Sequence, residues 1–253
     1  MLLCVDIGNS TVTFAVLEQS HIIYRRRFKT PRKSSASVSR SRFKRLLRGL
    51  KRQYTLEKRP IVCSVVPEAE KIVKVCIKRV LGEWPVVVGR DIFVPIKNNY
   101  YEPARLGQDR LVCAYAAKVI YGYPCIIADF GTAITFDFVN KAGEYEGGLI
   151  IPGIHIAAES LYQKTALLPN IIKLKEPKDI IGRNTKECIM KGIFLGYKHM
   201  CRGIINSFIQ KAEVQPYLIV TGGDIGHCSS FFDDMKYVVD EDLIFKGMSC
   251  ISQ

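Results

Sequence analysis

Two carboxylates in this sequence stand at the ends of apolar runs and are followed by the same kinds of residue. Asp6 ends the run at residues 2–5, and Asp129 ends the run at residues 126–128. In both places a glycine and a hydroxyl residue follow within a few positions. A buried strand that runs into Asp, Gly and a hydroxyl residue suits a site where backbone N–H groups approach phosphate closely and the carboxylate manages a cation. An ordinary turn built by Gly and Asp is the alternative, and the repetition favours phosphate chemistry.

A third carboxylate, Asp109, lies where a polar loop at residues 90–107 is predicted to become a helix. An Asp at a helix start is commonly a cap that contributes about 1 kcal/mol, and the tetrapeptide 107–110 alone favours that interpretation. The functional alternative is a general base, with Asp109 accepting a proton from a substrate hydroxyl while Arg110 holds an anionic group. In phosphoryl transfer such a base mainly positions the nucleophile.

The elements that must position these residues follow a plan that occurs twice. Each carboxylate at the end of an apolar run opens an alternating hairpin, so we predict a duplicated domain. In the first half we expect strands at 2–8, 11–18, 21–28, 60–66 and 84–88, with helices at 38–54, 67–81 and from 108. In the second half we expect three strands within 124–151, helices at 153–164 and 185–212, strands at 217–221 and 236–239, and a closing helix at 243–251. The apolar face of the helix at 185–212 is broad, so part of it meets either a second subunit or the protein's own core.

Composition describes a globular protein and excludes several classes. The 253 residues are 48% hydrophobic and 24% charged, which allows one large or two small domains with a sizeable core. No apolar run approaches the roughly 20 residues of a membrane-spanning helix, and Asp6 interrupts any secretory signal. The nine cysteines include no CxxC pair and predict a reducing compartment, while the four histidines have no metal-ligand spacing.

The formal charge of +13 is local. Residues 1–60 contain 15 basic and 3 acidic residues, whereas the remainder contains 22 basic and 21 acidic residues. The apolar positions between residues 38 and 54 lie on one helical face, so the basic residues occupy the other. A solvated helix face is favoured over a nucleic-acid or anionic-surface patch, because charge alone indicates solubility rather than a dedicated partner.

Seven short motifs occur in the order found in one family. They are Asp6-Ile7-Gly8-Asn9-Ser10, Gly107-Gln108-Asp109-Arg110, Asp129-Phe130-Gly131-Thr132-Ala133, Gly147-Gly148 with Pro152-Gly153, Asn184-Thr185, Thr221-Gly222-Gly223 and Leu243-Ile244-Phe245-Lys246-Gly247. Over nearly the whole chain the sequence resembles type III pantothenate kinases, which belong to the superfamily of acetate and sugar kinases, heat-shock ATPases and actin. The resemblance implies an α/β fold of two duplicated ribonuclease H-like domains, at 1–117 and 118–253. Each would be a mixed five-stranded sheet flanked by helices, with a cleft between the domains.

The resemblance also implies an activity and its site. The activity is ATP-dependent phosphorylation of pantothenate to 4′-phosphopantothenate, the first step of coenzyme A synthesis, in a cytoplasmic homodimer that uses a divalent cation (Mg²⁺) and a monovalent cation (K⁺ or NH₄⁺). By position, Asp109 would be the base, Asp129 would bind the monovalent cation and Asp6 would lie near the divalent ion. ATP would contact Asp6, Ile7, Gly8, Asn9, Ser10, Thr11, Val12, Thr13 and Thr132. Pantothenate would contact Tyr100, Gly107, Gln108, Asp109, Arg110 and Thr185. No membrane association is predicted.

Two positions depart from the family's pattern. Ser10 stands where Thr is commoner and keeps the hydroxyl, whereas Gln108 replaces the usual Ala and would alter substrate affinity if its side chain pointed into the pocket. Two alternatives remain open: a kinase for another small hydroxylated substrate, and a non-catalytic regulatory protein of the same fold.

Overall fold

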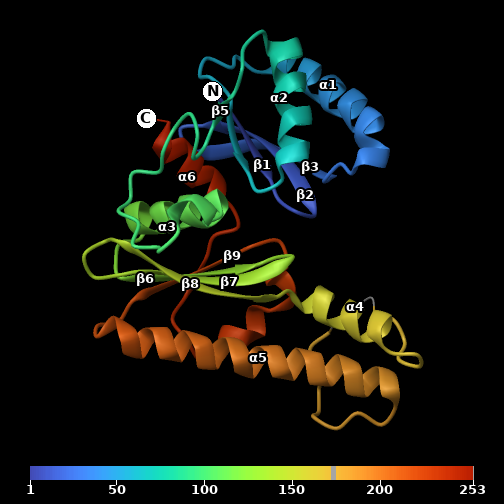
Figure 1. Cartoon of the computed structure of the whole chain (residues 1–253). Coiled ribbons are helices and arrows are strands. Elements are labelled where there is room, and N and C mark those ends of the chain that lie inside the picture. Colours follow the sequence, from blue (N-terminus) through green and yellow to red (C-terminus); the bar gives the residue numbers. More distant parts are fainter. Residues whose placement is uncertain (172–174, 253) are drawn as a thin grey trace. The chain divides into compact units, whose positions relative to one another are not determined.

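The chain folds into two compact units in a computed structural model that describes residues 1–171 and 175–252 (Figure 1). Unit 1 comprises Met1–Ile96, Tyr101–Ala116 and Asp242–Gln253, and unit 2 comprises Lys97–Tyr100 and Ala117–Glu241. Each contains one five-stranded sheet. The exact domain limits given above, 117 and 118, stay a prediction.

The sheet of unit 1 has the order β3-β2-β1-β4-β5. Its strands are β1 (Leu2–Ile7), β2 (Thr11–Glu18), β3 (His21–Lys29), β4 (Ile61–Ser64) and β5 (Val86–Val87). The first three pair antiparallel, whereas β4 joins β1 and β5 joins β4 in parallel. Its helices are α1 (Ala36–Gln53), α2 (Pro67–Leu81), the first part of α3 (Gln108–Ile120) and α6 (Leu243–Ile251).

The alternation of β1 divides its side chains between two faces. Leu3, Val5 and Ile7 belong to a buried cluster with residues of α1 and α2, including Phe43 and Val73. The intervening residues of β1 point to the opposite face of the sheet, because side chains alternate along a strand. This face also contacts α6. Asp6 therefore ends the strand on the face opposite to α1 and α2.

Unit 2 repeats the topology, with the order β10-β9-β6-β7-β8. Its strands are β6 (Cys125–Phe130), β7 (Ala133–Val139), β8 (Tyr145–Pro152), β9 (Tyr217–Thr221) and β10 (Val238–Val239), and its complete helices are α4 (Ile154–Lys164) and α5 (Thr185–Ala212). The pairing is antiparallel from β6 to β8 and parallel from β6 to β10, as in the first sheet. The predicted duplication into two mixed five-stranded sheets flanked by helices is confirmed.

The element boundaries differ from the prediction in a few places. Helix α1 begins at Ala36 rather than at residue 38. Strand β10 has only two residues, and the loop before α3 contains a 3-10 turn at Pro103–Arg105. Residues 170–183, which the sequence predicts to connect the helices at 153–164 and 185–212, lie partly outside the described residues.

The basic helix and the cysteines occupy the predicted environments. Phe43, Leu47 and Leu50 of α1 are buried, although Val38, which the pattern assigned to the same face, is 53% exposed. Seven of the nine cysteines are buried, where a thiol packs as a small apolar group. None of the described helices has the length and apolar character needed to cross a membrane.

Candidate active site

The loop between β1 and β2 is held by main-chain and hydroxyl contacts. The N–H of Gly8 donates to the carbonyl of Thr11 at 2.9 Å, which closes the turn. Thr30 fixes it from β3's end: its Oγ1 donates to the Gly8 carbonyl at 2.6 Å and its N–H donates to the Ser10 carbonyl at 2.9 Å. Asn9, Ser10 and Thr11 are exposed. A fixed, exposed loop with small and hydroxyl residues suits an approaching phosphate.

The remaining residues of the predicted first phosphate loop are less accessible. Val12 and Thr13 are 0% and 4% exposed, and Ile7 is also buried, so their side chains lie within unit 1. Asp6 is partly buried. Only Asp6 and residues 8–11 therefore offer side chains or an open main chain to a ligand.

The negative charges of Asp6 and Asp109 both influence one residue, Cys63. In the parallel pairing of β1 with β4, Asp6 lies opposite Cys63. Burial raises the pKa of the Cys63 thiol well above its usual value, and the negative charges of Asp6 and Asp109 raise this pKa further. Unit 1 therefore brings the carboxylate after its first strand and the carboxylate at the start of α3 into the same neighbourhood.

The start of α3 controls how the carboxylate of Asp109 lies. The N–H of Arg110 donates to Asp109 Oδ1 at 2.8 Å, and Arg110 itself is only 9% exposed. A Cβ added to Gly107 would come within 2.5 Å of Asp109 Oδ1, so the carboxylate occupies the space that a side chain at Gly107 would fill. Glycine is therefore the residue type that admits this orientation of Asp109.

Burial is the largest influence on the ionisation of Asp109. It raises the pKa of Asp109 above the ordinary value of 3.8, while the hydrogen bond and positive charge of Arg110 oppose the rise. A carboxylate with a raised pKa is a stronger base than an exposed one, which suits proton abstraction from a hydroxyl group.

The side chain of Gln108 lies against the chain of its own unit. A Cβ at Gly89, whose φ is +80°, would meet Gln108 Cδ at 2.5 Å, and Gln108 Nε2 donates to the carbonyl of Leu106 at 3.4 Å. Gln108 therefore packs over Gly89, a position that only a glycine leaves open.

The second carboxylate-tipped hairpin lies in unit 2, between β6 and β7. The N–H of Gly131 donates to the carbonyl of Ala133 at 3.1 Å, and the N–H of Gly153 donates to the carbonyl of Thr132 at 3.0 Å. Thr132 is exposed and Asp129 is partly buried. A Cβ at Gly153 would meet the carbonyl oxygens of Gly131 and Thr132 at 2.4 Å, so Gly153 permits the close approach of the two segments.

Gly222, after β9, also approaches this hairpin closely. Asp129 pairs with Thr221 across β6 and β9. Gly222 has φ +106°, and a Cβ there would lie 2.2 Å from the Phe130 carbonyl oxygen and 2.5 Å from Asp129 Oδ1. The exit of β9 and the carboxylate of Asp129 are therefore packed directly together.

Tyr100 belongs to a short segment, Lys97–Tyr100, that is part of unit 2. The N–H of Tyr100 donates to Asn98 Oδ1 at 3.0 Å, which restrains the main chain of this segment. The segment adds to β8 through main-chain bonds at Tyr145, whose N–H donates to the Lys97 carbonyl at 2.8 Å. The Tyr100 ring covers Gly147, where a Cβ would lie 3.4 Å from the ring.

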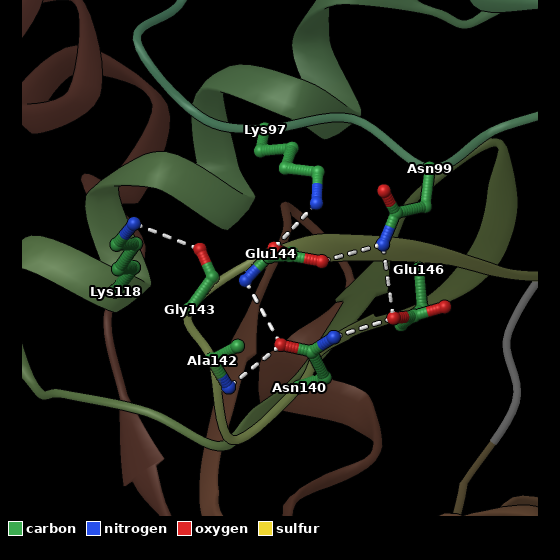
Figure 2. A network of polar contacts seen from close by, with 8 residues as sticks. All are labelled: Lys97, Asn99, Lys118, Asn140, Ala142, Gly143, Glu144 and Glu146. Carbon is green, nitrogen blue, oxygen red and sulfur yellow. Dashed lines mark hydrogen bonds and ion pairs between the residues drawn. The ribbon is translucent and has the colours of Figure 1, made fainter.

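A polar network fixes the same segment to the β7–β8 turn (Figure 2). Glu144 accepts from Lys97 Nζ at 2.8 Å and from Asn99 Nδ2 at 2.9 Å. Asn99 Nδ2 also donates to Glu146 at 3.1 Å, and Asn140 Nδ2 donates to Glu146 at 2.5 Å. The contacts with Lys97 and Asn99 hold the pKa of Glu144 below its usual value. The network therefore positions the segment that carries Tyr100.

Thr185 is the first residue of α5, and its side chain is exposed. The helix is capped by Asn184, whose Oδ1 accepts from the Glu187 N–H at 2.9 Å. This gives the predicted Asn184-Thr185 motif a structural role at the helix start. The predicted site residues are thus distributed between the units: Asp6 to Thr13 and Gly107 to Arg110 lie in unit 1, and Tyr100, Asp129, Thr132 and Thr185 lie in unit 2.

Sequence reasoning missed two residues that shape the first half of the site. Thr30 fixes the loop at residues 8–10, and Cys63 lies near enough to Asp6 and Asp109 for both charges to raise its pKa. A Thr before Pro31 carries no local signal of this role. Cys63 could have been found only by pairing β4 with β1 in the correct register.

Several solved structures share the fold of this chain. A solved structure described as a candidate 2-dehydro-3-deoxygalactonokinase from Sinorhizobium meliloti matches with a TM-score of 0.60 at 10% identity, covering 99% of this chain and 98% of the other. The ethanolamine utilization protein EutJ from Carboxydothermus hydrogenoformans matches with a TM-score of 0.56 at 15% identity, covering 98% and 89%. This likeness, together with the duplicated sheets, shows that the chain shares the fold of these solved structures.

The family follows from sequence comparison. The family model for type III pantothenate kinase matches residues 2–207. A type III pantothenate kinase from Sulfurihydrogenibium sp. (strain YO3AOP1) is 35% identical over 98% of both chains, and one from Persephonella marina is 37% identical over 88% of this chain and 87% of its own. The chain belongs to the type III pantothenate kinase family.

Proposed function

We propose that this protein transfers the γ-phosphoryl group of ATP to pantothenate and so forms 4′-phosphopantothenate, the first intermediate of coenzyme A synthesis. The observation that supports the mechanism is the partly buried carboxylate of Asp109, whose pKa is raised. Asp109 and Asp6 also both raise the pKa of the Cys63 thiol. The family membership of the chain supports the choice of substrate.

In this reaction Asp109 accepts the proton of the pantothenate hydroxyl. The hydroxyl oxygen forms a bond to the γ-phosphorus, and the bond between that phosphorus and the β–γ bridging oxygen breaks, releasing ADP. Arg110 provides a positive charge beside the base, and the Gly107 main chain leaves room for the carboxylate. Because phosphoryl transfer depends mostly on positioning and charge stabilisation, the base chiefly orients the attacking oxygen.

The nucleotide would be held by the two glycine-containing hairpins. The exposed loop at residues 8–11 offers N–H groups and hydroxyls, and Thr132 offers a hydroxyl in unit 2. Mg²⁺ usually takes one or two protein carboxylates together with substrate phosphates. Asp6 suits that role, since the described residues contain no group of three or more His, Cys, Asp or Glu side chains able to hold a metal by themselves. The ion would neutralise phosphate charge.

A monovalent cation, K⁺ or NH₄⁺, is proposed at Asp129. The carboxylate is partly buried and packs beside the Phe130 and Gly222 main chain. Such a site combines one negative charge with neighbouring main-chain groups, which are suitable oxygen donors for a large monovalent ion. Removing the ion should lower turnover without unfolding the protein.

The proposal includes a substrate site and an assembly. Tyr100, Gly107 to Arg110 and Thr185 would contact pantothenate, although the Gln108 side chain packs on Gly89 and would contribute through its main chain. We propose a cytoplasmic homodimer whose two units per chain act as actin-like ATPase domains near residues 1–117 and 118–253. The apolar groove between α4 and α5 is a suitable subunit contact, since it exposes Met200 and Leu161.

A coupled assay of ADP release, run with and without pantothenate in potassium and then in sodium buffer, tests the proposal. We expect release to require pantothenate and to be faster in potassium. A panel of other small hydroxylated substrates checks specificity, and a faster reaction with another member would replace pantothenate in the proposal. No ATP turnover with any substrate would instead indicate a regulatory protein.

A further inference from the structure

The surface between β3 and α1 contains a groove that the proposed reaction does not use. Its volume is about 490 Å³, within the range of small-molecule sites. Four arginines line it: Arg26 and Arg27 from β3, and Arg42 and Arg45 from α1. None of its lining residues belongs to the two hairpins or to the start of α3.

The charge of this groove is uncompensated by carboxylates. No Asp or Glu lines it, and within the described residues none of the four arginines forms an ion pair. Other basic residues of unit 1 do have acidic partners, such as Arg25 with Asp242 and Arg90 with Glu70. Like charges repel, so a groove lined by several arginines is electrostatically unfavourable unless an anion binds in it.

The arrangement of the groove favours phosphate groups over other anionic chemistry. Guanidinium groups bind phosphate oxygens in pairs with matched geometry, and here they come from two different elements around one concave surface. Gln53 adds an amide at one end. Residues 42–53 extend along α1 for about 17 Å at 1.5 Å per residue, enough for several consecutive phosphates.

The groove has open space at its glycine. Gly49 lies within it, and a Cβ added there would have no neighbour within 4 Å. The aromatic residues in its wall are already packed, since the ring of Phe28 lies 5.3 Å from Phe43 and that of Tyr24 lies 6.2 Å from Tyr54. Because these rings are engaged with the protein, stacking with nucleic-acid bases is disfavoured, and a small polyanion suits the space better than a strand or a membrane surface.

We propose that the groove between β3 and α1 binds a small molecule carrying two or more adjacent phosphate groups. Arg26 of β3 and Arg42 and Arg45 of α1 bind the phosphates, and Gly49 leaves the room that the ligand fills. This site is separate from the proposed kinase site and does not depend on its activity.

Inorganic tripolyphosphate is the probe, titrated calorimetrically into the full-length protein without divalent cations. The double variant Arg42→Gln with Arg45→Gln should bind at least about tenfold more weakly, because two charge-assisted contacts are lost. The matched control is Arg40→Gln with Arg48→Gln, which removes the same charge from α1 outside the groove and should bind like the wild type. Any binding of tripolyphosphate at the kinase site is common to all variants, so the difference reports the groove.

A second pair of variants tests whether the ligand occupies the open space at Gly49. Gly49→Glu places a carboxylate in the groove and should abolish binding, whereas Gly49→Ala should leave it intact; both replace glycine by a better helix former, so folding is preserved. Equal loss in the groove and control doubles would indicate general charge attraction and overturn the proposal. So would absence of binding by the wild type at millimolar probe. Binding of a single-stranded oligonucleotide or of anionic vesicles through Arg42 and Arg45, without binding of tripolyphosphate, would also overturn it in favour of that partner.

Discussion

Asp109 holds its carboxylate in a partly buried position at the first turn of α3, where burial opposes ionisation. An exposed residue would cap the helix equally well, so capping does not account for the burial. The proposed role as a base would account for it, because a base with a raised pKa transfers protons more effectively near neutral pH. Asparagine in its place keeps an oxygen that can accept from the Arg110 N–H but removes the basic site.

We predict that Asp109→Asn lowers kcat by about 10²- to 10⁴-fold, the range for loss of a general base. The measurement is steady-state ADP release with pantothenate, together with circular dichroism to establish folding. Glu102→Gln is the matched control, since it removes an exposed carboxylate from the loop before α3. Activity close to that of the wild type in the Asp109 variant would remove this residue from the mechanism.

The raised pKa of Asp109 also predicts a pH-dependent effect on stability. The folded-state pKa lies above the ordinary value of 3.8, so the folded protein favours the protonated form. The stability associated with this group is present below the unfolded pKa and is lost as pH rises through the folded pKa.

Asp109→Asn should therefore be at least as stable as the wild type at pH 7, and its relative stability should increase as pH rises from about 4. Urea unfolding at pH 4, 5, 6 and 7 measures the difference. A relative stability that falls over this interval would contradict the direction of the pKa shift. The Glu102→Gln control should show no such trend.

At the residue scale, the sequence predicts which residues are candidates for the site better than it predicts the contacts that they make. Asp6 and Asp129 were recognisable from apolar runs and turn residues. Asp109 was recognisable only from its place where a polar loop becomes a helix, and its role as a base came from the family resemblance. The place of Cys63 opposite Asp6 was not recognisable, since it depends on the register of β1 with β4. The packing of Gln108 on Gly89 likewise joins a β5 exit to α3, and no local pattern encodes it.

At the scale of elements, the end of β9 is tightly constrained by its contacts with the β6–β7 hairpin. Gly222 has a positive φ, and its Cα faces the Phe130 carbonyl and the Asp129 carboxylate. We predict that Gly222→Ala lowers the free energy of unfolding by about 2–4 kcal/mol, through both backbone strain and steric overlap. It should also weaken the response of activity to potassium, because Asp129 must move.

Gly226→Ala is the control for this prediction. It follows closely in the chain, has no positive φ and meets nothing within 4 Å, so its effect should stay within about 0.5 kcal/mol. Denaturant unfolding of both variants provides the comparison. Equal effects of the two substitutions would show that the contacts of Gly222 contribute nothing specific.

The sequence predicts most elements because each hairpin and amphipathic helix carries its own periodicity. The two-residue strand β10 and the start of α1 were less well predicted, since short strands and helix ends have little periodic signal. The segment Lys97–Tyr100 reads locally as part of a loop leading to α3. Its membership of unit 2 comes from pairing with Tyr145 and from the Glu144 and Glu146 network, contacts nearly 50 residues away in the chain (Figure 2).

At the scale of the whole molecule, the two sheets repeat one topology but carry different surfaces. Unit 1 holds the basic groove of β3 and α1, whereas unit 2 has an apolar groove of about 430 Å³ between α4 and α5. Leu161 and Met200 in that groove are 36% and 37% exposed, and Tyr162 nearby on α4 is 48% exposed. Exposed apolar surface of this kind commonly marks a protein contact, which is why we assign it to the proposed dimer.

We predict that Gly196→Glu converts the proposed dimer into a monomer. Gly196 lines the apolar groove on α5, and a Cβ there meets nothing within 4 Å, so the new side chain leaves unit 2 itself undisturbed. Its charge would have to be buried against a second subunit without a partner, which opposes association. Gly203→Glu is the control, because Gly203 is equally open on the same helix but lies outside the groove. Sedimentation velocity should show a monomer only for the first variant, and a dimer that survives Gly196→Glu would exclude this groove as the subunit contact.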